Sequence, residues 1–274
     1  MRVGLANTST NIARQEEDQA RLNAERWALG DLVDSYASRV LRPVEETLLD
    51  RYRVEFAGRV LELGCGAGRL TGHLCERARE VHAIDLSPAM VAYCQRTYPE
   101  ATFRVGDLGD LSAFDESGYD VVFAPFNVLD VLGDAARRAT LKRVHELLVD
   151  GGLLVMSSHN LHHAMRMRTR VRLHVRLVVG SPRRPIASLR SLPRRLRNRR
   201  RLRPLQHHTA DYAVLNDEAH DFSVIHYYVS PDVQRRQMQE AGYEFLECLD
   251  LAGGRVEPGE ATAYCSELHY VARR

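Results

Sequence analysis

The 274-residue chain almost lacks lysine: Lys142 is the only one, so arginine supplies nearly all of its positive charge. It has no run of 18 or more apolar residues and no long apolar core near its N-terminus, features that membrane spans and secretion signals require. Its five cysteines are odd in number and show no Cys-x-x-Cys spacing, which argues against a disulfide framework or a zinc site. These absences predict a cytoplasmic protein with reduced thiols, no membrane span and no metal.

The small net charge of +2 hides a strong asymmetry along the chain. Residues 160–210 contain fifteen arginines, from Arg166 to Arg203, and neither Asp nor Glu. Without those fifteen charges the net +2 becomes −13 for the rest of the chain. The length suits one domain with an insertion, or at most two domains, and a hydrophobic content of 45% is enough for a sizeable core. We therefore expect a basic insertion in an otherwise acidic protein.

A glycine-rich turn follows the first apolar run of the sequence. Residues 60–68 read Val-Leu-Glu-Leu-Gly-Cys-Gly-Ala-Gly, and a second apolar run, 81–84, ends at Asp85. A nucleotide site in a parallel sheet needs this pair of features about twenty residues apart. The glycines let the backbone of the turn approach the ligand closely, and the carboxylate binds the ribose hydroxyls. The pattern predicts a nucleoside-binding site.

The glycine spacing narrows the type of nucleoside. It is Gly-x-Gly-x-Gly, not the Gly-x-Gly-x-x-Gly of dinucleotide binders, and Glu62 stands directly before it. This segment resembles the first motif of class I S-adenosylmethionine-dependent methyltransferases. Three later segments stand in the order of that family: 103–108, 119–124 and 147–156. The resemblance covers residues 55–160 closely and 230–274 more loosely.

Apolar runs alternate with helical patterns through the middle of the chain, which predicts an α/β, doubly wound, Rossmann-like parallel sheet. The resemblance implies seven strands, mostly parallel, with the last strand antiparallel and an Arg-rich lid insertion. The expected strands are 59–63, 80–84, 102–105, 119–124 and 152–158, followed by a final pair at 244–251 and 265–272. The expected helices of the core are 67–78, 88–97 and 133–149, with another from 230 to 242.

Four segments are expected. Residues 1–54 would form an N-terminal helical cap, with the first ten disordered and helices over 13–29 and 43–52. Residues 55–159 would form the cofactor-binding core, 160–221 the basic insertion or lid, and 222–274, which opens with a strand over 222–229, the C-terminal part of the core sheet.

The basic insertion gives mixed local signals. Residues 166–179 alternate basic and apolar side chains, which fits a strand, yet arginine and leucine are good helix formers. Pro182, Pro185, Pro193 and Pro204 are expected to divide the rest into short pieces.

The resemblance implies S-adenosyl-L-methionine as cofactor and S-adenosyl-L-homocysteine as product. Glu62 would accept from the cofactor's amine, unless it is merely a solvated strand end. Asp85 would hold the ribose hydroxyls and Asp107 the adenine amine, while the glycine turn would bind the carboxylate at a helix N-terminus. Arg69 and Tyr36 are further candidates for that carboxylate. The complete set of expected cofactor contacts is Tyr36, Glu62, Gly64, Cys65, Gly66, Gly68, Arg69, Asp85, Leu86, Gly106, Asp107, Leu108, Phe126 and Asn127.

Two histidines are candidates for a general base, because imidazole titrates near working pH. His159 follows the fifth expected strand, where ligands bind in open α/β sheets, and His226 opens a His-Tyr-Tyr run. A structural role for both is the alternative, as a turn role is for Asn127. His162 and His163 lack nearby Cys, Asp or Glu and make a poor metal site.

The pattern as a whole favours methyl transfer to a small molecule or peptide, at oxygen on an acidic acceptor held under the basic lid. Two alternatives within the same chemistry are an RNA or nucleotide methyltransferase that binds phosphates through its arginines, and an N-methyltransferase of a small metabolite. The absence of Phe, Tyr and Trp from 160–210 weighs against base stacking on RNA. The remaining alternatives are a binding protein without catalysis, and arginines that only form a solvated face or bind the acidic body.

Overall fold

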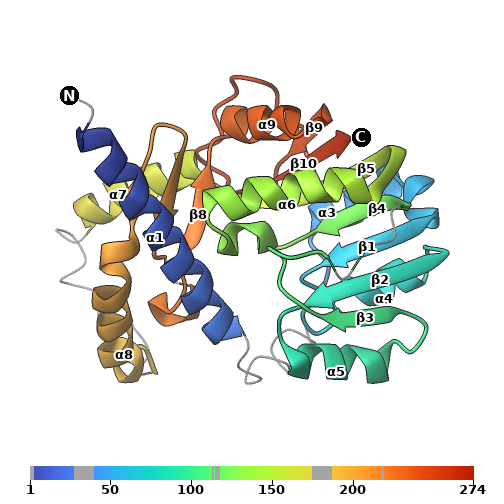
Figure 1. Cartoon of the computed structure of the whole chain (residues 1–274), viewed down its shortest axis with the longest axis horizontal. Coiled ribbons are helices and arrows are strands. Elements are labelled where there is room, and N and C mark those ends of the chain that lie inside the picture. Colours follow the sequence, from blue (N-terminus) through green and yellow to red (C-terminus); the bar gives the residue numbers. More distant parts are fainter. Residues whose placement is uncertain (1–2, 28–39, 113, 115–117, 175–186, 218) are drawn as a thin grey trace.

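The computed structural model describes residues 3–27, 40–112, 114, 118–174, 187–217 and 219–274. Seven strands form a twisted sheet in the order β3-β2-β1-β4-β5-β10-β9 (Figure 1). They are β1 (Arg59–Leu63), β2 (Glu80–Asp85), β3 (Thr102–Val105), β4 (Tyr119–Ala124), β5 (Leu148–Asn160), β9 (Glu244–Leu249) and β10 (Glu267–Arg273). The first five are parallel, whereas β10 runs antiparallel to both β5 and β9. This confirms the expected seven-stranded, doubly wound fold.

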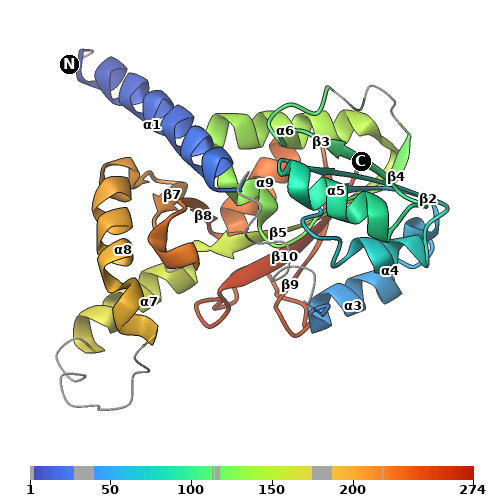
Figure 2. The ribbon, with the colours of Figure 1, turned by 90° about the horizontal axis from the view of Figure 1, so that it is seen from below.

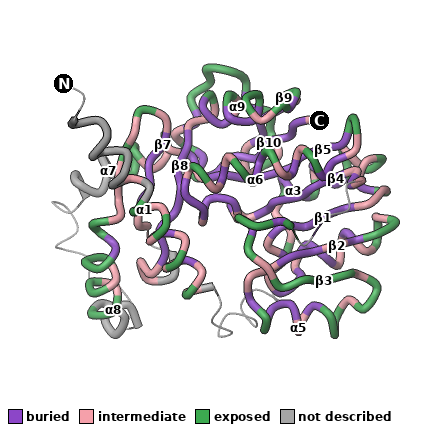
Figure 3. The backbone as a smooth tube through the Cα atoms, viewed as in Figure 1, coloured by how far each residue is buried: buried purple, intermediate pink, exposed green. Residues whose placement is uncertain are grey.

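Helices cover both faces of this sheet, which is why its central strands are apolar throughout. One face is covered by α3 (Pro43–Arg51), α4 (Thr71–Cys75) and α5 (Pro88–Thr97), the other by α6 (Asp134–Leu147) and α9 (Pro231–Glu240). Figure 3 shows the buried strands at the centre of the molecule and exposed residues along its outer helices. A short helix, η2 (Glu55–Ala57), leads into β1. None of the helices in the described ranges is long and apolar enough to span a membrane.

Three further strands extend the sheet from the far end of β5. The 13-residue β5 continues past the end of β4, and there β8 (His226–Val229) pairs with it in parallel, placing Tyr228 opposite His159. The strands β7 (Tyr212–Leu215) and β6 (His207–His208) follow by antiparallel pairing and bring the whole sheet to ten strands. The segment expected as part of the core, 222–229, thus supplies β8 of this extension. The extension has its own apolar cluster, which includes Leu202, Tyr212, Val214, Ile225 and Tyr227.

The basic insertion is largely helical. Of the ambiguous stretch 166–179, residues up to His174 lie in α7 (Leu161–His174), and the rest lies outside the described residues. Helix α8 (Ala187–Leu202) continues into η5 (Arg203–Leu205). The expected break at Pro193 was wrong, because α8 runs straight through it. Contacts with η6 (Ala219–Phe222) hold the helix beyond the proline: Arg194 pairs with the Asp221 carboxylate, and Asn198 Nδ2 donates to the Asp221 carbonyl at 3.0 Å.

The N-terminal cap differs from expectation at its start. Helix α1 spans Val3–Trp27, so the expected disorder of the first ten residues was wrong. Tertiary contacts support the helix, since Gln19 and Asn23 donate to the carbonyls of Leu132 and Val131. Another difference lies after β1, where the helix expected over 67–78 is reduced to α4 because the glycine turn occupies the first residues.

Candidate active site

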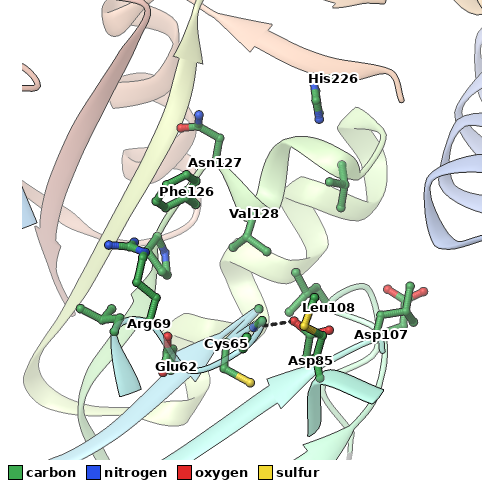
Figure 4. A pocket seen from close by; sticks show the side chains of 18 residues that line it. Glu62, Cys65, Arg69, Asp85, Asp107, Leu108, Phe126, Asn127, Val128 and His226 are labelled. Atoms are coloured by element: carbon green, nitrogen blue, oxygen red, sulfur yellow. Dashed lines mark hydrogen bonds between the residues drawn. The ribbon is translucent and has the colours of Figure 1, made fainter. Parts of the chain in front are cut away.

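A cavity opens at the carboxyl edge of β1, β2 and β4, and we call it the first cavity (Figure 4). Of the expected cofactor contacts, eleven line it: Glu62, Gly64, Cys65, Gly66, Arg69, Asp85, Leu86, Asp107, Leu108, Phe126 and Asn127. Gly68 and Gly106 lie outside the lining, and Tyr36 lies outside the described residues. The sequence analysis missed six lining residues: Ala67, Leu70, Met90, Pro125, Val128 and Val131.

The glycine turn has a shape that side chains would prevent. Gly64 has a φ of +69°, and a Cβ on it would come within 2.2 Å of the Val128 side chain. Gly68 has a φ of +78°, and a Cβ there would meet the Tyr98 ring at 2.4 Å. Gly68 therefore lets the turn pack against Tyr98, which lies outside the cavity lining, whereas Gly64 lets it pack against Val128 in the cavity wall.

Asp85 and Asp107 stand at the ends of neighbouring strands, as expected. The two carboxylate oxygens of Asp85 accept from the backbone N–H groups of Gly66 and Ser87, both at 2.8 Å. Burial raises the pKa of the Asp85 carboxyl, although those two bonds oppose the shift. Asp107 Oδ1 accepts from the Gly109 N–H at 2.8 Å. Each carboxylate oxygen keeps a lone pair for a further donor such as a ribose hydroxyl or an adenine amine.

Glu62 is almost wholly buried beneath the glycine turn. Its Oε2 accepts from Thr71 Oγ1 at 2.6 Å. Burial raises the pKa of its carboxyl to about 8, with Thr71 and the Arg69 charge opposing the shift. A buried carboxyl of this kind is ready to ionise beside a cation, because the cation would restore the charged form.

Arg69 occupies the cavity wall but is already paired. Its two terminal nitrogens bind the two oxygens of Glu45 at 2.6 Å each, and Glu45 is fully buried. Its guanidinium also lies over the ring of Phe126, 4.4 Å from the centroid, with Arg42 on the same ring at 3.8 Å. These contacts make Arg69 a fixed part of the cavity wall, with its charge balanced by Glu45.

Phe126 and Asn127 both adopt the left-handed backbone conformation, with φ of +56°. Strain of this kind in non-glycine residues is concentrated at functional sites. The Asn127 side chain is buried, and its Nδ2 donates to Glu267 Oε2 at 3.1 Å. Its Oδ1 has no hydrogen-bond partner within the described part of the chain, so a buried acceptor borders the first cavity.

His226 also lines the first cavity, across from Asn127 in Figure 4. It is buried, and its Nδ1 lies 2.7 Å from Asp217 Oδ2, which also accepts from the Tyr228 hydroxyl at 2.7 Å. Burial opposes protonation of the imidazole, but the Asp217 carboxylate outweighs it and raises the pKa of His226. With Nδ1–H donated to Asp217, the lone pair of Nε2 remains available.

His159 lies beside His226 but faces a different space. Its Nδ1 is 2.8 Å from Asp130 Oδ2, and Asp130 is fully buried and paired with Arg137 at 3.4 Å. The rings of His159 and His226 stack with centroids 4.8 Å apart and planes inclined at 26°. The structure thus brings the two expected histidines together, each hydrogen-bonded to its own carboxylate.

The same histidines and Asp217 could be considered as metal ligands, because each offers a ligand atom within 4.8 Å of the others. Imidazole lone pairs lie in the ring plane, however, and stacked rings do not point them at a common centre. Both Nδ1 atoms are also occupied by carboxylates. The geometry favours two hydrogen-bonded pairs over a metal site.

A second cavity, of about 1080 Å³, lies on the far side of the histidine pair. His159, Asp217 and Tyr228 line one part of it, and three arginines line another: Arg199, Arg200 and Arg203. Since His226 lines the first cavity, the stacked rings separate the two spaces. Sequence reasoning missed Asp130, Asp217 and Tyr228, and only the pairing of Leu215 with His226 across β7 and β8 brings Asp217 to the histidine.

Comparisons with known proteins agree with this architecture. Residues 60–152 match the family model described as a methyltransferase domain. A ubiquinone biosynthesis O-methyltransferase of Xanthomonas euvesicatoria is 30% identical over 157 residues, which are 56% of this chain and 64% of that protein. The chain therefore spans somewhat less than two thirds of the length of this relative.

Solved structures share the fold at lower identity. The CcbJ methyltransferase of Streptomyces caelestis superposes with a TM-score of 0.56 at 20% identity, covering 88% of this chain and 95% of its own. The 1,6-didemethyltoxoflavin-N1-methyltransferase of Burkholderia thailandensis gives 0.58 at 15% identity, with 94% and 90% covered. Residues 60–152 therefore match a methyltransferase domain, and the chain shares the fold of solved methyltransferases.

Proposed function

We propose that this protein transfers a methyl group from S-adenosylmethionine to a hydroxyl oxygen of an anionic small-molecule acceptor. The observation that carries the proposal is the pairing of His226 with Asp217 at the edge of the first cavity. A hydroxyl is a poor nucleophile until its proton is taken, and an imidazole oriented by a carboxylate performs that task.

The residues of the first cavity fit the proposed cofactor. Because Gly64 has no side chain, the turn leaves space beside Val128 that a Cβ would occupy. The buried Asn127 Oδ1 can accept a hydrogen bond from a donor such as an ammonium group. Glu62 offers a carboxyl that a cation would ionise. Asp85 and Asp107 would hold the ribose hydroxyls and the adenine amine. The cofactor supplies the electrophilic methyl group, and the protein supplies position and a place for the proton.

The proton from the acceptor hydroxyl would pass to Nε2 of His226 as the oxygen–methyl bond forms and the sulfonium carbon–sulfur bond breaks. Asp217 then stabilises the imidazolium, as its effect on the pKa of His226 indicates. Because the base must be neutral, activity should rise as the pH increases through a value above 6.5, the ordinary pKa of histidine.

Asp217→Asn tests this arrangement. We expect kcat to fall about 100-fold, within the usual range for general-base catalysis, and the acidic limb of the pH profile to move to lower pH. Asp211→Asn is the matched control, because Asp211 is a surface carboxylate of the same sheet extension that pairs with Arg236. An unchanged profile in Asp217→Asn would exclude His226 as the base.

Labelled methyl donor and a cell extract would identify the acceptor class. We expect label in acidic small molecules and resistance of that label to mild alkali, because ethers survive conditions that cleave methyl esters. Label in RNA would favour the nucleotide alternative, and label in amines would favour N-methylation. Alkali-labile label would show methylation of a carboxylate, which needs no base.

A further inference from the structure

The second cavity combines an apolar side with a basic side. The apolar side comes from α7, α8, β7 and η6 and includes Met167, Leu196, Leu215 and Phe222. The basic side carries the guanidinium groups of three arginines from α8 and η5: Arg199, Arg200 and Arg203. The histidine pair closes a third side, at the boundary with the first cavity.

Two large hydrophobic side chains on the apolar side are exposed. Met167 is 42% exposed and Leu196 48% exposed, and both line the second cavity. Figure 2 shows α7 and α8 projecting together from the rest of the molecule. Large exposed apolar side chains that gather around one hollow indicate a place for an apolar ligand.

The arginines of the basic side have no carboxylate partner in the described part of the chain. On α8, Arg194 and Arg195 pair with Asp221, and Arg201 lies 3.9 Å from Glu25. Within the described ranges, no carboxylate lies within 4.0 Å of the three cavity arginines. Arg199 instead lies over the Phe222 ring, 5.4 Å from its centroid, which joins the basic side to the apolar side.

We propose that the second cavity binds an amphiphilic acid, with its apolar body between α7 and α8 and its anionic group on Arg199, Arg200 and Arg203. This inference rests on the proposed methyl transfer, because it treats the second cavity as the acceptor site. The arginines line the second cavity and not the first, so the acid holds the ligand in place, and the hydroxyl to be methylated has to extend past the histidine pair to His226 in the first cavity.

Binding can be measured without knowing the natural acceptor. The probe is dodecanoate below its micelle concentration, added to the full chain saturated with S-adenosylhomocysteine and detected by displacement of anilinonaphthalene sulfonate. We expect dodecanoate to bind at least tenfold more tightly than dodecyltrimethylammonium, which has the same chain and the opposite charge. Acetate should not compete, because it lacks the apolar body, and AMP should not compete, because the cavity is apolar on one side.

Variants locate the site. Arg199→Gln with Arg203→Gln should weaken dodecanoate binding about tenfold, and Leu196→Asn should weaken it without changing the preference for the anion. Arg197→Gln is the control, because Arg197 is exposed on the same helix and does not line the cavity. The circular dichroism spectrum and the affinity for S-adenosylhomocysteine should remain at wild-type values in every variant.

The outcomes separate this inference from the proposed function. Equal binding of the two dodecyl probes, or equal loss in Arg197→Gln and in the double variant, would overturn the amphiphile site while methyl transfer stands. Tighter binding of AMP than of dodecanoate would overturn it in favour of a nucleotide acceptor. Failure of S-adenosylhomocysteine to bind in the first titration would overturn the methyl-transfer proposal itself.

Discussion

At the scale of single residues, Glu62 shows how burial prepares a carboxyl group for a cationic ligand. It lies under the glycine turn with one hydroxyl donor, and its pKa is raised to about 8. Its carboxyl is therefore mostly protonated at pH 7 in the ligand-free protein. An ammonium group placed nearby would lower that pKa and expel the proton.

We expect binding of S-adenosylhomocysteine at pH 7 to release close to one proton, and to strengthen as the pH rises toward about 8. Calorimetric titrations in two buffers with different ionisation enthalpies measure the release. Glu62→Gln should bind more weakly, with heats that no longer depend on the buffer. Buffer-independent heats in the wild-type protein would contradict the proposed contact.

Asp85→Ala should weaken binding of S-adenosylhomocysteine by about 1.5–3 kcal/mol, because a charge-assisted hydrogen bond is lost. Asp85 also holds the Gly66 and Ser87 N–H groups, so thermal unfolding must confirm that the variant remains folded. Asp110→Ala, at an exposed carboxylate in the next loop, provides the comparison. A change of less than twofold in Asp85→Ala would remove Asp85 from the ribose site.

The two halves of the site differ in how far the sequence predicts them. Glu62, Asp85 and Asp107 each stand at the end of a parallel strand, so local pattern alone places them at one edge. Asp217 and His226 meet only because β7 and β8 pair across η6, and no spacing rule anticipates that contact. Spacing therefore predicted the proposed donor side, while the acceptor side depended on tertiary structure.

At the scale of elements, α1 is attached by polar side chains at specific carbonyls. Asn23 Nδ2 donates to the carbonyls of Val131 and Ile225 at 2.9 and 2.8 Å, and Asn23 Oδ1 accepts from the Ile225 N–H. Asn23 is buried, so these bonds are shielded from water. One residue thus joins α1 to η3 (Val128–Val131) and to the start of the extension.

Asn23→Ala should lower the free energy of unfolding by about 1–3 kcal/mol, because it leaves buried backbone groups without partners. It should also weaken cofactor binding, since Val131 lines the first cavity. Urea unfolding and calorimetry test the two effects. Glu17→Ala, at an exposed position of the same helix, should change neither quantity, and equal effects in both variants would contradict the role of Asn23.

Helix α8 marks the limit of local rules at this scale. A proline inside a helix costs about 3 kcal/mol in isolation, and that rule predicted a break at Pro193. The contacts of Arg194 and Asn198 with Asp221 lie just beyond the proline and stabilise the continuous helix. Such contacts join residues more than twenty positions apart, so propensity alone could not reveal them.

At the scale of the whole molecule, the core sheet and the extension have separate apolar clusters. Their strands are joined by the pairing of β5 with β8 at only two positions, His159–Tyr228 and Asn160–Val229. The alternation of strands and helices predicted the core sheet, because each unit is local. The extension as a unit was not predicted, because no α-helix separates its three short strands and only 222–229 was expected as a strand.

We expect hydrogen exchange to divide the protein along this boundary. Backbone amides of β7 and β8 should exchange together at a lower opening free energy than those of β1, β4 and β5, because the smaller cluster buries less apolar surface. Mass spectrometry of peptides from 212–229 and 119–124 measures the difference. Equal protection in both peptides would indicate a single cooperative unit.

The overrun of β5 past β4 has a consequence for how such a protein can change its substrate. Residues 161–229 leave and rejoin the body at that one strand end, whereas the wall of the first cavity is built almost entirely before residue 132. Replacement of this segment by another of different shape would therefore change the second cavity and remove the proposed base, His226, while the rest of the first cavity stays in place. The end of β5 is thus the position at which a different acceptor-binding segment could be joined to the same proposed cofactor site.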